Sequence, residues 1–196
     1  MSMIKSALEI ALERTRDVEG NKEALEASTF TNEGKRAVSK FMSAEADSLK
    51  ELLAKYQKKQ LAWVREGAYQ ALMANLKLPV DEMAFKQSKR AAEGLFALVS
   101  DPKRLTKHLG QMEHFFEEYL EERKRITTAV ERQYAPRLRQ KEEEMSRKMG
   151  AAVKIDPHSD PEFVKLLKQN LVLLEDRYTA VLEQVKGELK KMVFEG

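Results

Sequence analysis

The longest regular pattern of hydrophobic positions in the chain runs from Ser100 to Met149. Apolar residues recur there at alternating spacings of three and four, which is typical of a helix that packs one face against another helix. The stretch opens with Asp101 as a helix N-cap and Pro102 at the first helical position. The pattern predicts a helix over about 102–148, which at ~1.5 Å per residue would be roughly 70 Å long. Its packing face consists of Leu105, Leu109, Met112, Phe116, Tyr119, Ile126 and Val130, with Arg123 in the one polar position.

The spacing changes near the middle of this predicted helix. Val130, Tyr134 and Leu138 follow one another at intervals of four, which locally unwinds a supercoiled pair of helices. Pro136 lies within this change and cannot donate a backbone hydrogen bond to residue 132. We therefore predict a kink or a break near residues 133–136.

The last part of the chain has the most regular pattern. Its apolar positions are Phe163, Leu167, Leu171, Leu174, Tyr178, Val181, Val185, Leu189 and Met192. These positions predict a helix over 160–194. Asp160 before Pro161 fits an N-cap, and Ser159 with Glu162 fits a capping box, so the sequence leaves two candidates for the cap. Because only a short loop joins this helix to the preceding one, the two should pack antiparallel.

The first hundred residues predict three further helices, over about 3–18, 33–77 and 81–99. The first should end at Gly20, because glycine favours the C-cap, and the polar stretch 28–34 interrupts the pattern. The second should end before Pro79, since the residue that precedes proline avoids helical geometry. The first helix is too short to be stable alone in water, so it should dock on the rest of the chain or on a partner.

Three glycines lie inside predicted helices: Gly67, Gly94 and Gly110. A glycine in a helix interior costs about 1 kcal/mol relative to alanine. A close approach of two helices, which a side chain would prevent, offsets that cost. We therefore predict that helices cross closely at these three positions.

Together these helices predict an all-α fold, in the form of an elongated antiparallel helical bundle or coiled coil. We expect a single helical domain over residues 1–196, with a compact bundle portion at about 60–120 and a two-helix arm at about 121–194. Composition agrees with this fold class. Hydrophobic residues make up 42% of the chain and charged residues 34%, with 8 glycines and 5 prolines, a balance typical of long helices with solvated faces.

Charge and cysteine content exclude several classes of protein. The net charge is +3, from 35 basic and 32 acidic residues, which gives the whole chain little attraction to polyanions. The chain has no cysteine, which excludes disulfides, thiolate metal sites and a cysteine nucleophile. No apolar run reaches the ~20 residues that span a bilayer, and residues 1–14 lack the features of a signal peptide. We therefore expect a cytoplasmic protein without a membrane span.

Candidate catalytic or metal-binding residues are few. His108 and His114 are six positions apart on one predicted helix and so point in different directions, and neither has Glu at the spacing that di-iron helical bundles use. His114 with Glu117 or Glu118 offers a partial metal site at most. The chain has no Gly-x-Ser-x-Gly motif and no glycine-rich phosphate-binding loop. We therefore expect no cofactor, no metal and no enzymatic activity.

The remaining pattern favours binding over catalysis. We expect a non-enzymatic helical protein–protein interaction module, either an adaptor, an assembly factor or a structural subunit, that binds a protein partner or self-associates into an oligomer. The candidate contact residues are Tyr178, Val181, Val185, Leu189 and Val193 on the last helix, with Val130, Tyr134, Leu138 and Met145 facing them. The alternative is a nucleic-acid-associated protein that uses the basic residues of 123–139, although there arginine and lysine alternate with glutamate, as in helix-stabilising ion pairs.

Overall fold

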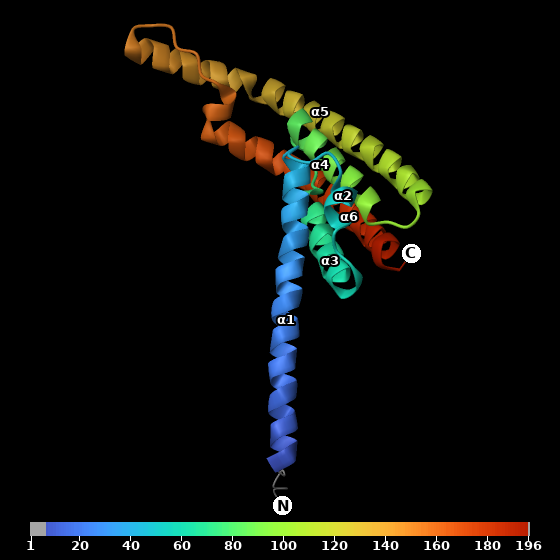
Figure 1. Cartoon of the computed structure of the whole chain (residues 1–196). Helices are drawn as coiled ribbons and strands as arrows, with labels where there is room; N and C mark the ends of the chain where they lie inside the picture. Colours follow the sequence, from blue (N-terminus) through green and yellow to red (C-terminus); the bar gives the residue numbers. More distant parts are fainter. Residues whose placement is uncertain (1–6, 196) are drawn as a thin grey trace, which may run out of the picture. The chain divides into compact units, whose positions relative to one another are not determined.

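The computed structural model of the chain describes residues 7–195, with side chains from residue 22 onward (Figure 1). Helix accounts for 83% of the chain and the described residues contain no strand, so the predicted all-α fold class is confirmed. The helices are α1 (Ala7–Met42), α2 (Leu49–Leu53), α3 (Lys58–Asn75), α4 (Glu82–Gly94), α5 (Pro102–Met149) and α6 (Pro161–Phe194). Two short 3-10 helices, η1 (Leu95–Ala97) and η2 (Pro157–Ser159), follow α4 and precede α6.

α1 is longer than the sequence predicts. It runs without interruption through Gly20 and through the polar stretch 28–34, so the predicted helix end and the predicted interruption are both wrong. One glycine costs a helix only about 1 kcal/mol, which is too little to end it. Packing holds the polar stretch helical, because the Phe30 ring stacks on Trp63 of α3 at 6.2 Å. Residues 3–6 of the predicted first helix lie outside the described residues.

The predicted helix over 33–77 is instead divided into the end of α1, α2 and α3. Ala44 and Lys58 have φ angles of 62° and 50°, in the left-handed region that ordinary helices do not use. Between them, the Ser48 hydroxyl accepts a hydrogen bond from the Glu51 N–H at 3.3 Å and caps α2. These turns return the chain so that α3 lies beside α1 and runs in the same direction, with Glu23 next to Lys59 and Thr31 next to Gly67.

The α1–α3 contact is close because glycines stand on both helices. A Cβ atom added to Gly34 would lie 2.1 Å from the Val64 carbonyl oxygen, and one added to Gly67 would lie 1.9 Å from the Thr31 carbonyl oxygen. The close crossing predicted at Gly67 is therefore confirmed. Gly94 likewise faces the Leu72 side chain, but a Cβ at Gly110 would meet nothing within 4 Å, so the prediction for Gly110 is wrong.

The chain divides into two compact units. Unit 1 contains residues up to 76 together with 90–102, and unit 2 contains 77–89 together with 103–196. The organisation expected from the sequence, one domain with a bundle portion and an arm, stays a prediction. The supercoiling of the helices also stays a prediction.

In unit 2, α5 and α6 pack side by side in opposite directions, as predicted (Figure 1). The Tyr119 ring lies 5.0 Å from the Tyr178 ring, and the Tyr134 ring lies 5.5 Å from the Phe163 ring. Of the two candidates for the cap of α6, the structure uses Asp160, whose carboxylate accepts a hydrogen bond from the Glu162 N–H at 3.0 Å.

α5 is continuous through Pro136, so a break at that position is wrong, while a kink there stays a prediction. Contacts on both sides hold the helix together where the proline removes one hydrogen bond. Tyr134 is buried against Phe163 before it, and Lys141 pairs with Asp160 after it.

The glycine crossing yields a first prediction. Replacing Gly67 by alanine should lower the free energy of unfolding of unit 1 by about 1–3 kcal/mol, because the new methyl group would overlap the Thr31 carbonyl and the backbones would have to separate. Urea denaturation followed by the fluorescence of Trp63, the only tryptophan in the chain, would measure the change.

Gly187→Ala is the matched control, because this glycine also lies inside a helix but a Cβ atom added to it would meet nothing within 4 Å. The same replacement there should stabilise α6 by roughly 1 kcal/mol through helix propensity alone, which circular dichroism would measure because Trp63 belongs to unit 1 and α6 to unit 2. Equal stabilities of the Gly67→Ala variant and the native protein would contradict the close crossing.

Candidate functional site

Residues 77–81 form an extended segment that crosses α5 and α6 in unit 2. Pro79 is fully buried, and Leu78 packs on the cluster of Tyr119, Leu171, Leu174 and Tyr178. The buried Ser88 hydroxyl on α4 donates a hydrogen bond to the Lys77 carbonyl at 2.8 Å. At the other end, the Asp81 carboxylate accepts a hydrogen bond from the Ala84 N–H at 2.7 Å and opens the helix that follows. The segment is therefore held from both α4 and the α5–α6 pair.

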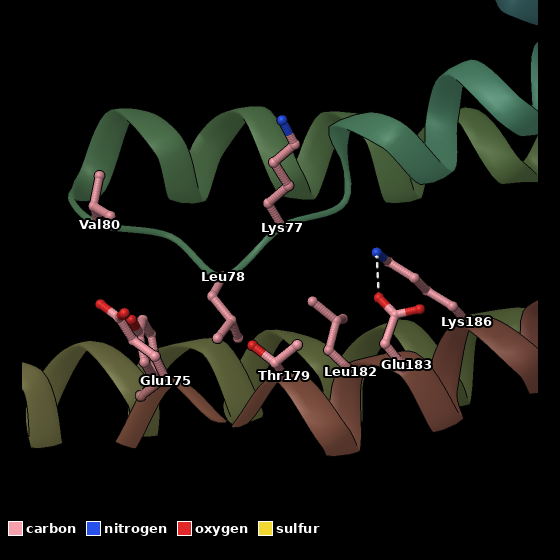
Figure 2. A pocket seen from close by; sticks show the side chains of 9 residues that line it. Lys77, Leu78, Val80, Glu175, Thr179, Leu182, Glu183 and Lys186 are labelled. Atoms are coloured by element: carbon pink, nitrogen blue, oxygen red, sulfur yellow. Dashed lines mark hydrogen bonds and ion pairs between the residues drawn. The ribbon is translucent and has the colours of Figure 1, made fainter. Parts of the chain in front are cut away.

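One hollow of about 370 Å³ lies between this segment and α6, and we call it the α6 hollow. It is lined by Lys77, Leu78, Val80, Tyr119, Glu175, Thr179, Leu182, Glu183 and Lys186. Figure 2 shows Leu78 pointing from the segment toward Thr179, with the ion pair between Lys186 and Glu183 at one end. The lining combines apolar and charged groups, and its two acidic residues each have a basic partner, at 2.8 Å in both pairs.

Arg123 connects the two helices below the segment. Its guanidinium donates to the Glu175 carboxylate on α6 at 2.8 Å and to the Tyr119 hydroxyl at 3.3 Å. Burial raises the pKa of Tyr119, which keeps its hydroxyl neutral. The one polar position in the predicted packing face of α5 is therefore occupied by an ion pair to the neighbouring helix.

A second hollow, of about 630 Å³, lies along α5, and we call it the α5 hollow. It is lined by Val80, Asp81, Glu82, Leu120, Glu121, Arg123, Lys124, Thr127, Thr128 and Glu131. Val80 lines both hollows and is 59% exposed, and Met83, three residues further along the chain, is 72% exposed. The α5 hollow thus has one strongly exposed apolar side chain in its lining, on Val80, and more acidic than basic groups.

The predicted contact residues occupy different positions from those expected. Val130 and Tyr134 pack against Phe163 at the start of α6, while Tyr178 packs against Phe115 and Tyr119, so the two predicted groups do not face each other and that part of the prediction is wrong. The short 150–160 connection sets this register, because it brings the start of α6 back against the middle of α5. Leu189 and Val193 are also buried, Val185 and Leu138 are half-buried, and Met145 and Val181 are exposed. Their role as partner contacts stays a prediction.

A polar network at the start of α6 was not predicted. The Lys141 ammonium lies 2.6 Å from the Asp160 carboxylate and 2.7 Å from the Glu162 carboxylate, and the Tyr134 hydroxyl donates to Asp160 at 2.9 Å. Asp160 is only 5% exposed. The hydrogen bond from Lys141 is the main reason that the pKa of Asp160 falls from 3.8 to about 2. The spacing of Tyr134, Leu138 and Lys141 on one helix face was the available signal in the sequence.

The histidines and the helices bear on the predictions about metals and membranes. Among the described residues, no group of three or more His, Asp or Glu side chains could hold a metal ion. His114 lies 3.3 Å from Glu118 on the exposed face of α5, and His108 lies 3.3 Å from Glu188 at the edge of the α5–α6 contact. None of the helices in the described part of the chain is long and apolar enough to cross a membrane.

The network at Asp160 yields a second prediction, on pH. Since the pKa of Asp160 is lower in the folded chain than its ordinary value of 3.8, its contribution to stability is complete above pH 3.8 and is lost as the pH falls through about 2. In Lys141→Met the pKa of Asp160 should rise, so the variant should be less stable at neutral pH and lose less stability on acidification. Thermal unfolding followed by circular dichroism from pH 6 to pH 2 would measure both effects.

Arg125→Met is the matched control, because Arg125 also pairs with a carboxylate, on Glu121 at 3.4 Å, but both side chains of that pair are exposed. Exposed ion pairs contribute little to stability, so this variant should follow the native pH profile. If Lys141→Met also followed the native profile, Lys141 would not be what lowers the pKa of Asp160.

Comparison of the chain with curated proteins and with solved structures found no match. A protein-family model matches residues 50–191, a range that includes every residue lining the two hollows. This range covers most of the chain, and the description of the family names no activity. The chain therefore belongs to DUF6657, a family of unknown function.

Proposed function

We propose that the protein is a non-enzymatic helical protein–protein interaction module, and that the α5 hollow binds a basic amphipathic segment of a partner protein. The observation that carries the proposal is the exposure of Val80, which lines a hollow with more acidic than basic groups, and of Met83, which directly follows the lining residue Glu82 in the chain. We also propose that the protein works in the cytoplasm, the location expected from its sequence.

The apolar part of the proposed contact consists of Val80, Met83 and Leu120. Burying one such side chain completely stabilises a complex by about 1.5–3 kcal/mol. Apolar side chains in the middle and polar groups around them are the usual arrangement in protein interfaces. Methionine suits such a contact because its unbranched side chain adapts to different partner surfaces.

The charge of the hollow indicates the chemistry of the partner. Four carboxylates line it, on Asp81, Glu82, Glu121 and Glu131, against two basic side chains, on Arg123 and Lys124. Arg123 is already paired with Glu175, and Glu121 with Arg125, so one group of each sign is offset and the acidic excess of two remains. The hollow therefore favours cations, and a partner segment with lysine or arginine around its apolar residues complements it.

The titratable groups of unit 2 support a binding role over a catalytic one. Perturbed pKa values often mark catalytic residues, but here the groups concerned connect helices. Burial raises the pKa of Tyr178, whose hydroxyl donates to Glu122 across the α5–α6 contact at 3.3 Å. Asp160 and Lys141 similarly join the start of α6 to α5.

The nucleic-acid alternative is less well supported. Within 123–139, Arg123 pairs with Glu175, Arg125 with Glu121, and Arg137 with Glu162. These partners weaken the attraction of the arginines for phosphate. The acidic lining of the neighbouring α5 hollow opposes it further.

The third prediction tests the proposed function with two amphipathic peptides that share the same leucine positions and carry either lysine or glutamate elsewhere. The lysine peptide should bind to the intact protein and the glutamate peptide should not, and added salt should weaken binding because it screens surface charge. Replacing both Val80 and Met83 by serine should lower the affinity by about tenfold or more. Fluorescence anisotropy of labelled peptides would measure the affinities.

Leu173→Ser is the matched control, because Leu173 is 78% exposed on α6 and lines neither hollow. It should leave the affinity unchanged. Light scattering over a range of protein concentrations would show whether a second copy of the chain occupies the hollow. In that case the mass should rise with concentration for the native protein but not for the double serine variant. Failure of the lysine peptide to bind, together with a constant mass, would refute the proposal. Salt-sensitive binding to duplex DNA would favour the nucleic-acid alternative.

A further inference from the structure

A third hollow lies in unit 1, where a strongly polar stretch of the sequence forms the turn between α2 and α3. Its volume is about 200 Å³. We call it the cationic hollow. It is lined by Glu33, Arg36, Ala37 and Lys40 of α1, by Leu52 of α2, and by Lys55 and Tyr56 of the turn.

The charges of this hollow are unequal. Three basic side chains line it, on Arg36, Lys40 and Lys55, against the single carboxylate of Glu33. The carboxylate already accepts a hydrogen bond from the Tyr56 hydroxyl at 2.8 Å and forms an ion pair with Arg36 at 3.4 Å. The formal charge of the lining is therefore +2 at neutral pH, from three positive groups and one negative group.

The turn that carries Lys55 and Tyr56 is held in place from several sides. The Tyr56 ring contacts Phe30 edge to face at 6.1 Å, and the Lys55 ammonium lies 4.9 Å from the centre of the Tyr56 ring. The hydrogen bond with Tyr56 is the main cause that raises the pKa of Lys55 and lowers that of Glu33, so both stay charged at neutral pH. Lys58, directly after the turn, has a left-handed φ of 50°. Such strain persists only where the surrounding structure fixes the conformation.

We propose that the cationic hollow binds a small, doubly charged oxyanion, namely a phosphate group, either free or on a small phosphomonoester. Its charge would balance the two excess positive charges of the lining. The planar guanidinium of Arg36 can donate two parallel hydrogen bonds to such an ion, and the two lysines can add further charge-assisted ones. Ala37, which is buried, and Leu52, which is half-buried, form the apolar part of the lining.

This site is independent of the proposed partner surface. All its residues belong to unit 1, whereas the α5 hollow belongs to unit 2. Its ligand is a small anion, and the partner proposed for the α5 hollow is a basic peptide. Either proposal can therefore fail without affecting the other.

The fourth prediction tests this site by titrating the full-length protein with sodium phosphate against sodium chloride at equal ionic strength. Phosphate should cause saturable changes in the amide NMR signals of residues 36–40 and 55–56, and chloride should not. Lys40→Gln and Lys55→Gln should each weaken phosphate binding by about tenfold, the effect of losing one charge-assisted hydrogen bond. A parallel titration with phosphoserine would give a second affinity. The ligand that binds more tightly, phosphate or phosphoserine, would show whether the site takes a free or an esterified phosphate.

Lys35→Gln is the matched control, because Lys35 is an exposed lysine of α1 that does not line the hollow. It makes the same change in net charge and should leave phosphate binding unchanged. The proposal is overturned if phosphate and chloride cause the same changes, or if Lys35→Gln weakens binding as much as Lys40→Gln does. All three positions are exposed, so the variants should fold, and their circular dichroism spectra would verify this.

Discussion

The packing of aromatic rings between α5 and α6 is the interaction on which the structure of unit 2 depends. Two ring contacts, Tyr119 with Tyr178 and Tyr134 with Phe163, lie fifteen residues apart on each helix and together fix the register. Each such pair contributes about 0.5–1.5 kcal/mol beyond the burial of its area. Leu78 packs on the first contact, so the position of the extended segment, and with it both hollows, follows from the aromatic register.

The helices of unit 2 could be predicted because their local and tertiary signals agree. Asp160 and Pro161 favour a helix start in any surroundings, and the apolar positions of α6 match the face that the structure buries. The helices of unit 1 could not be predicted in the same way. The crossing of Gly34 and Gly67 keeps α1 helical through a polar stretch, and the turn at Ala44 requires a conformation that alanine seldom adopts. Neither effect leaves a periodic pattern in the sequence.

The hollows were missed for a related physical reason. An apolar residue that recurs at helical spacing is the kind of residue that the chain buries in its own core, as Leu189 and Val130 are here. Surface available to a partner also includes apolar residues that do not belong to the patterns of α5 and α6, such as Val80, before α4, and Met83, in its first turn. A search for partner contacts along the most regular pattern therefore selects mostly residues that the chain buries itself, with Met145 and Val181 as the exposed exceptions.

The near balance of charge in the whole chain conceals an unequal local distribution. Residues 80–82 meet 120–131 in a mainly acidic hollow, and residues 33–40 meet 52–56 in a mainly basic one. In each case the two segments are remote in sequence, so the excess arises only on folding. Surface charges are screened beyond about 10 Å at 0.1 M salt, so a ligand at either hollow responds to the local charge rather than to the net charge of +3. The net charge therefore argues against a general affinity for polyanions, but it does not decide which ions or segments bind at a particular place.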